Sequence, residues 1–523
     1  MLRKHRRAAW GASIAAGVAL TGAAVPTTAG AAAVGAAEAA PRTARAAPPT
    51  PTRAFTTAPI AWRACGDDGK AKCGSLRLPI DWAHPDGATF ELAIARRKAK
   101  GPDARVGTLV FGPGGPGDSG VQRVTKLKDG IDRFSERLQR RFDIVSFDPR
   151  GIGASHPVTC SAALLRDSPS PVITSRKEFA ATLDYNKRLR DDCRRRTGPL
   201  YDHADTLSTV RDVDAIRAAL GESKLTFHGS SYGTLLGEMY AETFPKRIRA
   251  MVLESVDDHS LRTARPFLES ELVAAQDSFD QFVAWCGRTT SCALHGKDVR
   301  AIWRGLRARA ARGDLPDLDH PGSVLPEFGL VLKAYKAFYG PDWAGLASEL
   351  VALDASKPAT PTAPATPATP AAGPSAPKDP EPTGTDNFTA QFCSDWGLQV
   401  RGYKEYAGLM RRMKKIAPDM TQARPVVAVT KCLGWPQPVR NPQHRLKVHG
   451  SAPILLSNAR HDPATPYAWA RNVARQLGRT GTLLTYEGSG HGSYNRGPCM
   501  RDTIDEYLIS LKVPARGTTC PAT

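Results

Sequence analysis

Three residues have the types and the order in the chain that nucleophilic catalysis on a carbonyl group requires. Ser231 lies at the centre of Gly229-Ser230-Ser231-Tyr232-Gly233, which fits the Gly-x-Ser-x-Gly pattern, and Asp462 and His491 follow it in the C-terminal part of the chain. A serine hydroxyl is a weak nucleophile, so it needs a histidine base that is held in place by a carboxylate. The three residues therefore predict a Ser-His-Asp hydrolase that forms an acyl-enzyme.

Each of the three residues follows a short apolar run that we expect to be a strand. The runs are 225–228 before Ser231, 453–457 before Asp462 and 482–486 before His491. Side chains at the carboxyl ends of parallel strands gather at one edge of an open sheet, where active sites lie. Small residues two positions either side of Ser231 let the chain turn sharply from the strand into the apolar helix that follows.

Two other histidines compete for the role of the base. His461 adjoins Asp462, but its place before the aspartate would invert the expected order Ser, Asp, His. His228 lies inside the strand that precedes Ser231, and we expect it to be packed or hydrogen-bonded in the core. The sequence therefore favours His491.

Acyl transfer also needs donors for the oxyanion. The backbone N–H of Tyr232, directly after the nucleophile, is the first expected donor. The second is a glycine of the loop 112–120, which follows an expected strand at 106–111, and Gly115 is our prediction. A phosphate-binding loop is the alternative for this segment, but it contains neither GxxxxGK[ST] nor GxGxxG.

The apolar runs alternate with helical stretches, which predicts an α/β fold with a mostly parallel sheet and helices on both faces. Further strands are expected at 142–147 and 250–253, and an amphipathic helix at 205–220. The core would consist of residues 61–255 and 451–523. The 256–450 insertion is mostly helical in pattern and too long for one crossover, so it predicts a cap, with a Pro-rich linker at 357–385.

The 523 residues carry a formal net charge of +20, with 41% hydrophobic and 23% charged residues, which is a globular composition. The basic residues are spread along the chain, so we expect a solvated basic surface and no nucleic-acid partner. Residues 1–35 read as a signal peptide and 36–60 as a propeptide or disordered leader, which predicts secretion. The alternative, a membrane anchor, would need a longer apolar run, so we expect no stable membrane insertion after cleavage.

Ten cysteines in an exported chain predict disulfides rather than metal ligands, because CxxC and clustered Cys/His spacings are missing. We therefore expect neither a metal nor a cofactor. Short loops close with the least loss of entropy. This favours the pairs Cys65–Cys73, Cys160–Cys193, Cys286–Cys292, Cys393–Cys432 and Cys499–Cys520, although the spacing alone does not prove the connectivity.

The sequence resembles the secreted α/β-hydrolase exopeptidases related to prolyl aminopeptidase, and especially the tripeptidyl aminopeptidases. The resemblance spans roughly residues 60 to 510 and rests on GGPG at 114–117, FDPRGIGAS at 147–155, CSDW at 393–396 and the segments around Ser231, Asp462 and His491. Pro113 stands where the family usually has a histidine. The resemblance implies an α/β-hydrolase fold with a large, mainly helical cap, and release of short peptides, tripeptides in particular, from free N-termini.

An exopeptidase of this kind must bind the ammonium group of its peptide substrate, and an unpaired buried charge is costly. We expect Glu254 or Asp395 to provide the carboxylate, with Asp257 and Asp258 as reserves. Two alternatives share the fold: a secreted esterase or lipase-type hydrolase, and an exported binding protein without catalytic activity. The complete set of Ser231, Asp462 and His491 argues against the second.

Overall fold

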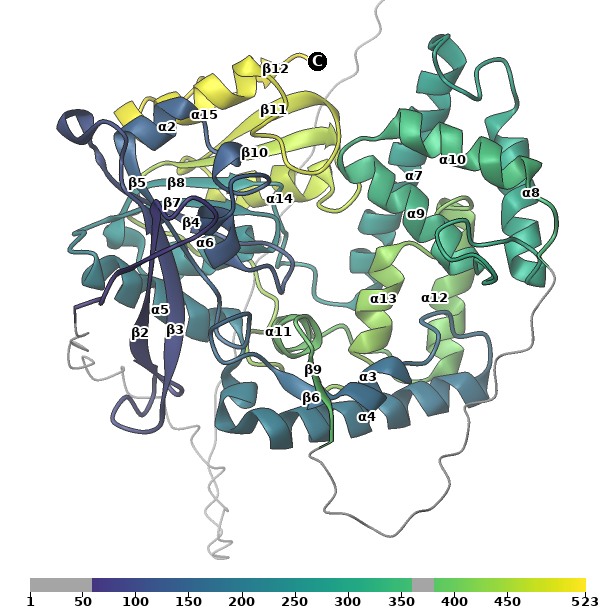
Figure 1. Ribbon diagram of the computed structural model, residues 1–523, viewed down its shortest axis with the longest axis horizontal. Helices are drawn as coiled ribbons and strands as arrows, with labels where there is room; N and C mark the ends of the chain where they lie inside the picture. The colour runs from purple at the N-terminus through teal and green to yellow at the C-terminus, as the bar shows by residue number, and fades with distance from the viewer. Residues whose placement is uncertain (1–58, 360–380) are drawn as a thin grey trace, which may run out of the picture. The chain divides into compact units, whose positions relative to one another are not determined.

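The structure is a computed structural model that describes residues 59–359 and 381–523 (Figure 1). The expected signal peptide at 1–35 and nearly all of the expected leader at 36–60 lie outside the described residues. So do residues 360–380, the larger part of the expected linker at 357–385. Within the described residues, no helix is both long enough and apolar enough to cross a membrane.

The central element is a ten-stranded sheet with the order β1-β2-β3-β5-β4-β7-β8-β10-β11-β12 (Figure 1). Strands β5, β4, β7, β8, β10, β11 and β12 run parallel, and β1, β2 and β3 pair antiparallel at one end. The strands are β1 Arg63–Cys65, β2 Ala71–Pro79, β3 Thr89–Arg97, β4 Gly107–Gly112, β5 Phe142–Phe147, β7 Leu225–Ser230, β8 Ile248–Glu254, β10 Ile454–His461, β11 Gly481–Ser489 and β12 Thr519–Cys520.

All six expected strands are present, as β4, β5, β7, β8, β10 and β11. Strands β2 and β3 were not expected, because they do not read as continuous apolar runs. In both strands charged residues alternate with apolar ones. Arg77 of β2 and Glu91 of β3 are examples: both are exposed, and they form an ion pair across the two strands at 2.9 Å. Such alternation is typical of strands with one solvated face.

Helices cover both faces of the sheet. Leu, Val and Ile side chains of α5, α6 and α14 form one hydrophobic core with the strands, and those of α1, α2 and α15 form another on the opposite face. Asp205 caps the expected amphipathic helix by accepting a hydrogen bond from the Ser208 N–H at 2.9 Å. The helices are α1 Gly120–Thr125, α2 Glu136–Arg141, α5 Thr206–Ala219, α6 Tyr232–Thr243, α14 Tyr467–Leu477 and α15 Pro498–Ser510.

The insertion after β8 is helical, as the sequence predicts, and has its own hydrophobic core around Phe279, Trp303 and Tyr335. We call this insertion the cap. Its helices are α7 Ala264–Arg288, α8 Val299–Arg312, α9 Glu327–Tyr339, α10 Trp343–Ala355, α11 Thr389–Asp395, α12 Tyr403–Ile416 and α13 Arg424–Lys431.

A segment assigned to the core by sequence packs against the cap instead. It comprises β6 Thr159–Ser161, α3 Ala162–Arg166 and α4 Arg176–Thr197. Strand β6 pairs antiparallel with β9, Thr383–Thr385, which lies within the range expected to be linker. On α4, Asn186 donates to the carbonyls of Thr430 and Leu433 at 2.9 and 3.0 Å. The cap therefore packs against residues 159–197, a segment that precedes it in the chain by more than 50 residues.

The ten cysteines form five disulfides, in the pairs that their spacing favours. Cys393–Cys432 joins the segment of α11 to the end of α13. Cys499–Cys520 ties α15 to β12 at the C-terminus. Covalent links of this kind restrict the unfolded chain and so stabilise the fold.

The FDPRGIGAS segment contains a buried ion pair. Arg150 and Asp212 are both fully buried, and the guanidinium donates to the two carboxylate oxygens at 2.7 and 2.6 Å and to the carbonyls of Pro79 and Ile80 at 3.2 and 2.7 Å. The indole N–H of Trp82 also donates to Asp212, at 2.9 Å. This network ties the end of β2 to α5 and to the loop after β5.

Replacing Arg150 with methionine is expected to lower the free energy of unfolding by about 3–5 kcal/mol, because Asp212 would be left as a buried charge without its partner. Urea denaturation measures this change. Arg188→Met is the matched control, since Arg188 forms an exposed pair with Asp184 on the surface of α4 and should contribute less than about 1 kcal/mol. Equal effects of the two variants would contradict a structural role for the buried pair.

Candidate active site

Ser231 stands at a sharp turn between β7 and α6. Its backbone has φ 56° and ψ −126°, a strained conformation for a residue with a side chain. A Cβ on Gly229 would lie 2.3 Å from the Gly233 carbonyl oxygen, and one on Gly233 would lie 2.3 Å from the Gly112 carbonyl oxygen. The spacing of the two glycines around Ser231 therefore follows from the close approach of the backbone at this turn.

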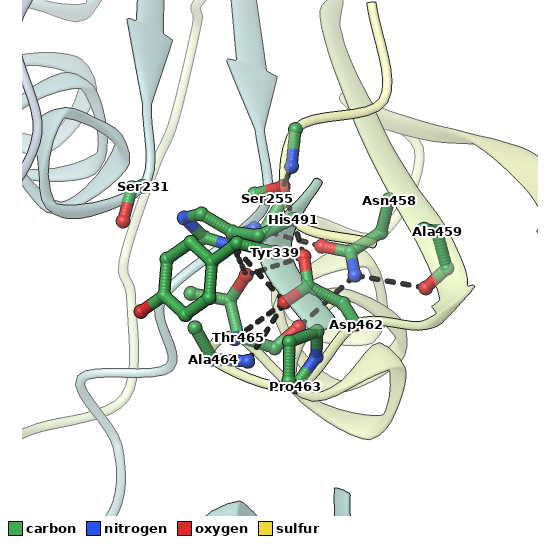
Figure 2. Close-up of polar contacts among 12 residues, drawn as sticks. Ser231, Ser255, Tyr339, Asn458, Ala459, Asp462, Pro463, Ala464, Thr465 and His491 are labelled. Atoms are coloured by element: carbon green, nitrogen blue, oxygen red, sulfur yellow. Dashed lines mark hydrogen bonds and ion pairs between the residues drawn. The ribbon is translucent and has the colours of Figure 1, made fainter. Parts of the chain in front are cut away.

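His491 and Asp462 lie together at the carboxyl ends of β11 and β10. The imidazole Nδ1 is 3.0 Å from Asp462 Oδ1 and 3.1 Å from Oδ2. Figure 2 shows the imidazole between Asp462 and the Ser231 hydroxyl, and the residues drawn there show no hydrogen bond between His491 and Ser231. Such catalytic hydrogen bonds often tighten only when substrate binds.

The Asp462 carboxylate is held in a fixed position. It is 1% exposed and accepts hydrogen bonds from the backbone N–H groups of Ala464 and Thr465, both at 2.9 Å, and from the hydroxyls of Ser255 and Thr465, both at 3.0 Å (Figure 2). Burial favours the neutral imidazole of His491, but the Asp462 carboxylate outweighs this effect and raises the pKa of His491. This arrangement suits a base that accepts a proton during the reaction.

The cap also contacts the histidine. The Tyr339 ring of α9 lies 4.8 Å from the His491 ring, between centroids, and the Tyr339 carbonyl accepts the His491 backbone N–H at 3.0 Å. Arg424 of α13 donates to the Tyr339 hydroxyl at 3.2 Å and to the Gly115 carbonyl at 3.3 Å. Cap residues therefore touch both the loop of His491 and the loop of Gly115.

The two expected oxyanion donors lie beside Ser231. Tyr232 is the first residue of α6, where a backbone N–H has no partner within the helix. Gly115 and Ser231 line the same pocket. We call residues 112–120 the glycine loop. Asp148 holds this loop in place, because it accepts hydrogen bonds from the Ser119 hydroxyl at 2.6 Å and from the Val121 N–H at 3.0 Å.

A pocket of about 220 Å³ opens on one side of Ser231, and we call it the first pocket. Aromatic cap residues form much of its wall: Phe267, Phe388, Phe392 and Trp396. Two acids also line it, Asp257 from the loop after β8 and Glu271 from α7. Among the described residues, neither carboxyl group has a hydrogen-bond or ion-pair partner, although the basic Arg424 and Lys431 line the same pocket.

Burial raises the pKa of Asp257 to about 7 and raises that of Glu271 well above its ordinary value. The first pocket therefore contains two carboxyl groups that are costly to ionise without a cation beside them.

A larger cavity of about 1020 Å³ is also lined by Ser231, and we call it the second pocket. His491 and Gly492 line this pocket and not the first one. Ser231, Gly115 and Arg424 line both. The nucleophile thus lies where the two pockets meet.

The acids expected to bind an ammonium group have other partners. Asp395 is fully buried, lines neither pocket and accepts hydrogen bonds from the Thr206 N–H at 3.0 Å, the Thr206 hydroxyl at 2.7 Å and the Tyr232 hydroxyl. Glu254 lines the second pocket and accepts hydrogen bonds from His228 at 3.0 Å and the Tyr494 N–H at 2.7 Å. Asp258 binds Ser260 and Asn472. Only Asp257 of the four lines the first pocket.

The competing His461 lies at the end of β10, where its Nδ1 is 2.7 Å from Asp277 Oδ2. Three residues of the site were not expected from the sequence: Glu271, Tyr339 and Arg424. Each lies on an amphipathic cap helix, where an acid, a tyrosine or an arginine reads as an ordinary surface or core residue. Within 59–359 and 381–523, no group of three or more His, Cys, Asp or Glu side chains is placed to hold a metal ion.

Comparison with known proteins adds to this geometry. Residues 419–520 match a family described as TAP-like protein within the α/β hydrolases. Serine protease Hip1 of Mycobacterium tuberculosis is 31% identical, over 88% of this chain and 91% of its own length. The chain belongs to this TAP-like family of α/β hydrolases. It is a serine peptidase of the α/β-hydrolase type.

Two further relatives have different names. Tripeptidyl aminopeptidase of Streptomyces lividans is 30% identical over 88% of this chain and 87% of its own length. A protein named carboxylesterase B, from Mycobacterium tuberculosis, is 28% identical over 86% of each chain. The family match and the mostly parallel sheet confirm the expected fold, and the relatives named as peptidases confirm the expected class of enzyme.

Proposed function

We propose that this enzyme is exported and releases short peptides, tripeptides in particular, from substrates with a free N-terminus. One observation carries the proposal: two carboxyl groups without partners, Asp257 and Glu271, line the pocket next to Ser231. A substrate ammonium placed between them would supply the missing cation, and it would let both carboxyl groups ionise. The aromatic wall would contact the side chains of the released peptide.

The chemistry follows from the positions of the three candidate catalytic residues. Ser231 Oγ attacks the carbonyl carbon of the scissile peptide bond while His491 Nε2 accepts the hydroxyl proton. The backbone N–H groups of Tyr232 and Gly115 stabilise the oxyanion. His491 then gives the proton to the leaving nitrogen. Water attacks the Ser231 ester while His491 accepts a proton from it, and His491 returns this proton to Ser231 Oγ as the peptide leaves with a new carboxyl group.

The name of the Streptomyces lividans relative supports tripeptide release, and five disulfides in the chain support export to an oxidising compartment. An esterase is the second candidate, because one relative is named carboxylesterase B and the first pocket has an aromatic wall. The two candidates differ in whether activity depends on a substrate ammonium.

Asp257→Asn and Glu271→Gln are each expected to lower kcat/KM for tripeptide p-nitroanilides with a free amine by about 10- to 100-fold, since each removes a charged partner of the ammonium. An N-acetylated ester of the same tripeptide should be affected far less. The ratio of kcat/KM for the free-amine substrate to kcat/KM for the acetylated one should also rise as the pH increases through about 7, where Asp257 ionises, because the titration of His491 affects both substrates.

Asp354→Asn provides the control, because Asp354 is exposed on α10 and lines neither pocket. An equal loss on acetylated and free-amine substrates would assign Asp257 and Glu271 a structural role. Rapid cleavage of N-blocked peptides by the unaltered enzyme would rule out the aminopeptidase proposal and favour an esterase or an endopeptidase.

A further inference from the structure

The second pocket is strongly basic. Five basic side chains line it, against two acids, Asp118 and Glu254; the basic residues are Arg123, Arg133, Lys336, Arg424 and Arg496. They come from separate segments: the core between β4 and β5, helices α9 and α13 of the cap, and the loop after β11. An accumulation of charge from separate segments in one cavity creates a local field that a ligand would experience.

The position of His491 indicates which part of a substrate enters this pocket. The general acid must give its proton to the leaving nitrogen, so the leaving part of the substrate has to pass beside the imidazole. His491 lines the second pocket and not the first, whereas Asp257 and Glu271 line only the first. The released N-terminal part therefore belongs in the first pocket and the leaving part in the second.

Within the part of the chain that the structure describes, several of the basic groups have no carboxylate partner. Arg123 donates to the Asp129 carbonyl at 3.2 Å, with its guanidinium carbon 5.1 Å from the centre of the Phe111 ring. Arg496 donates to carbonyl oxygens of the described residues, among them those of Gly492 at 3.0 Å and Tyr339 at 2.7 Å. Lys336 is exposed on α9. Arg133, in contrast, forms an ion pair with Asp129 at 2.7 Å.

The two acids of the pocket offset only part of this charge. Burial opposes the ionisation of Glu254, but the hydrogen bond from His228 outweighs it and lowers the pKa of Glu254. The resulting carboxylate is occupied by His228 and the Tyr494 N–H. Asp118 is exposed at the glycine loop. The cavity therefore keeps an excess of positive charge beside the leaving group.

We infer that the second pocket binds the leaving part of the substrate and selects a carboxylate there. This inference rests on the proposed function, because it takes the leaving part to be the C-terminal remainder of a peptide. The carboxylate can come from an acidic side chain after the scissile bond or from the free C-terminus of a short substrate. Arg123 and Lys336 are the specificity residues that the geometry assigns to this preference.

The test compares peptides with the same N-terminal part, Ala-Ala-Ala, and different leaving parts: Glu-Ala-NH2, Gln-Ala-NH2, Lys-Ala-NH2 and Gln-Ala with a free C-terminus. Products are followed by mass spectrometry. We expect kcat/KM for the Glu-Ala-NH2 peptide, or for the peptide with a free C-terminus, to exceed that for the Gln-Ala-NH2 peptide about five- to tenfold. Each exposed charge pair contributes a factor of roughly two to five. The Lys-Ala-NH2 peptide should have the lowest kcat/KM of the four. The first and last substrates distinguish a side-chain carboxylate from a terminal one.

Arg123→Gln and Lys336→Gln should each reduce the ratio of acidic to neutral substrate by roughly two- to fivefold. Lys414→Gln is the matched control, an exposed lysine of α12 that lines neither pocket, and it should leave the ratio unchanged. Added salt should weaken the preference. Equal rates for acidic and neutral leaving parts, or an equal loss of preference in Lys414→Gln, would overturn the inference and assign any preference to the overall charge of +20.

A second measurement separates this inference from the proposed function. Ac-Glu-Ala-NH2 and Ac-Gln-Ala-NH2 carry no ammonium group, and each is tested as a competitive inhibitor of hydrolysis of a p-nitrophenyl ester. Tighter inhibition by the Glu compound, lost in Lys336→Gln, would support the basic subsite even if no free-amine peptide were cleaved. Equal inhibition by the two compounds would overturn it, even if the aminopeptidase proposal held.

Discussion

Replacing Ser231 with alanine is expected to lower kcat by about 10⁴- to 10⁶-fold, because the reaction loses its nucleophile and keeps only the binding pockets and the oxyanion donors. The change removes one oxygen atom at a solvent-accessible turn, so the melting temperature should stay close to that of the unaltered enzyme. Initial rates with a tripeptide p-nitroanilide measure the loss. Covalent labelling by a fluorophosphonate should disappear in the same variant.

Ser348→Ala is a suitable control for the labelling experiment, since Ser348 is exposed on α10. It should retain both labelling and turnover. Retained turnover in Ser231→Ala would refute the assignment of the nucleophile, and the whole account of the two pockets would then fail with it.

Asp462→Asn is expected to lower kcat by about 10⁴-fold, because an amide no longer holds the imidazole of His491 in the reactive tautomer and no longer stabilises its charged form. The pH profile gives an independent readout. His491 must be neutral to accept a proton, and its pKa is raised. Activity of the unaltered enzyme should therefore rise with pH around a midpoint above the ordinary histidine value, and this midpoint should move to lower pH in the variant.

His461→Ala is the control for this prediction. His461 lies one residue from Asp462 and pairs with Asp277 on α7, so its loss should reduce activity only mildly. A loss as severe as that of His491→Ala would identify His461 as the base and would contradict the assignment based on the order of the residues.

Much of the site could be predicted because its chemistry depends on local pattern. The Gly-x-Ser-x-Gly turn, the apolar strands and the polar residues after them are each visible within a few residues of sequence. Asp257 and Glu271 differ, because a carboxyl group without a partner is a property of its surroundings. The sequence of α7 presents Glu271 as one acid among several on an amphipathic helix, and only the packing of α7 beside the loop after β8 places it in the pocket.

The surroundings of Asp395 are likewise a property of the fold. The CSDW segment at 393–396 is one of those that carry the resemblance, so its acid, Asp395, was expected to have a binding role. In the fold, however, Asp395 accepts hydrogen bonds from Thr206 at the start of α5 and from Tyr232 at the start of α6. Its burial could not be read from the sequence, because its two partners lie more than 160 residues away.

The contacts of Tyr339 and Arg424 affect how this enzyme could be re-engineered. Because Tyr339 accepts the backbone N–H of His491 and Arg424 donates to the carbonyl of Gly115, the inserted helices supply part of the scaffold for proton transfer as well as walls for the substrate. Excising the insertion to obtain a minimal hydrolase would remove that support. Exchanging it for the insertion of a homologue would change the reaction rate and the substrate selectivity together. Chimaeras should therefore keep α9 with the loop of His491 and α13 with the loop of Gly115 from the same protein.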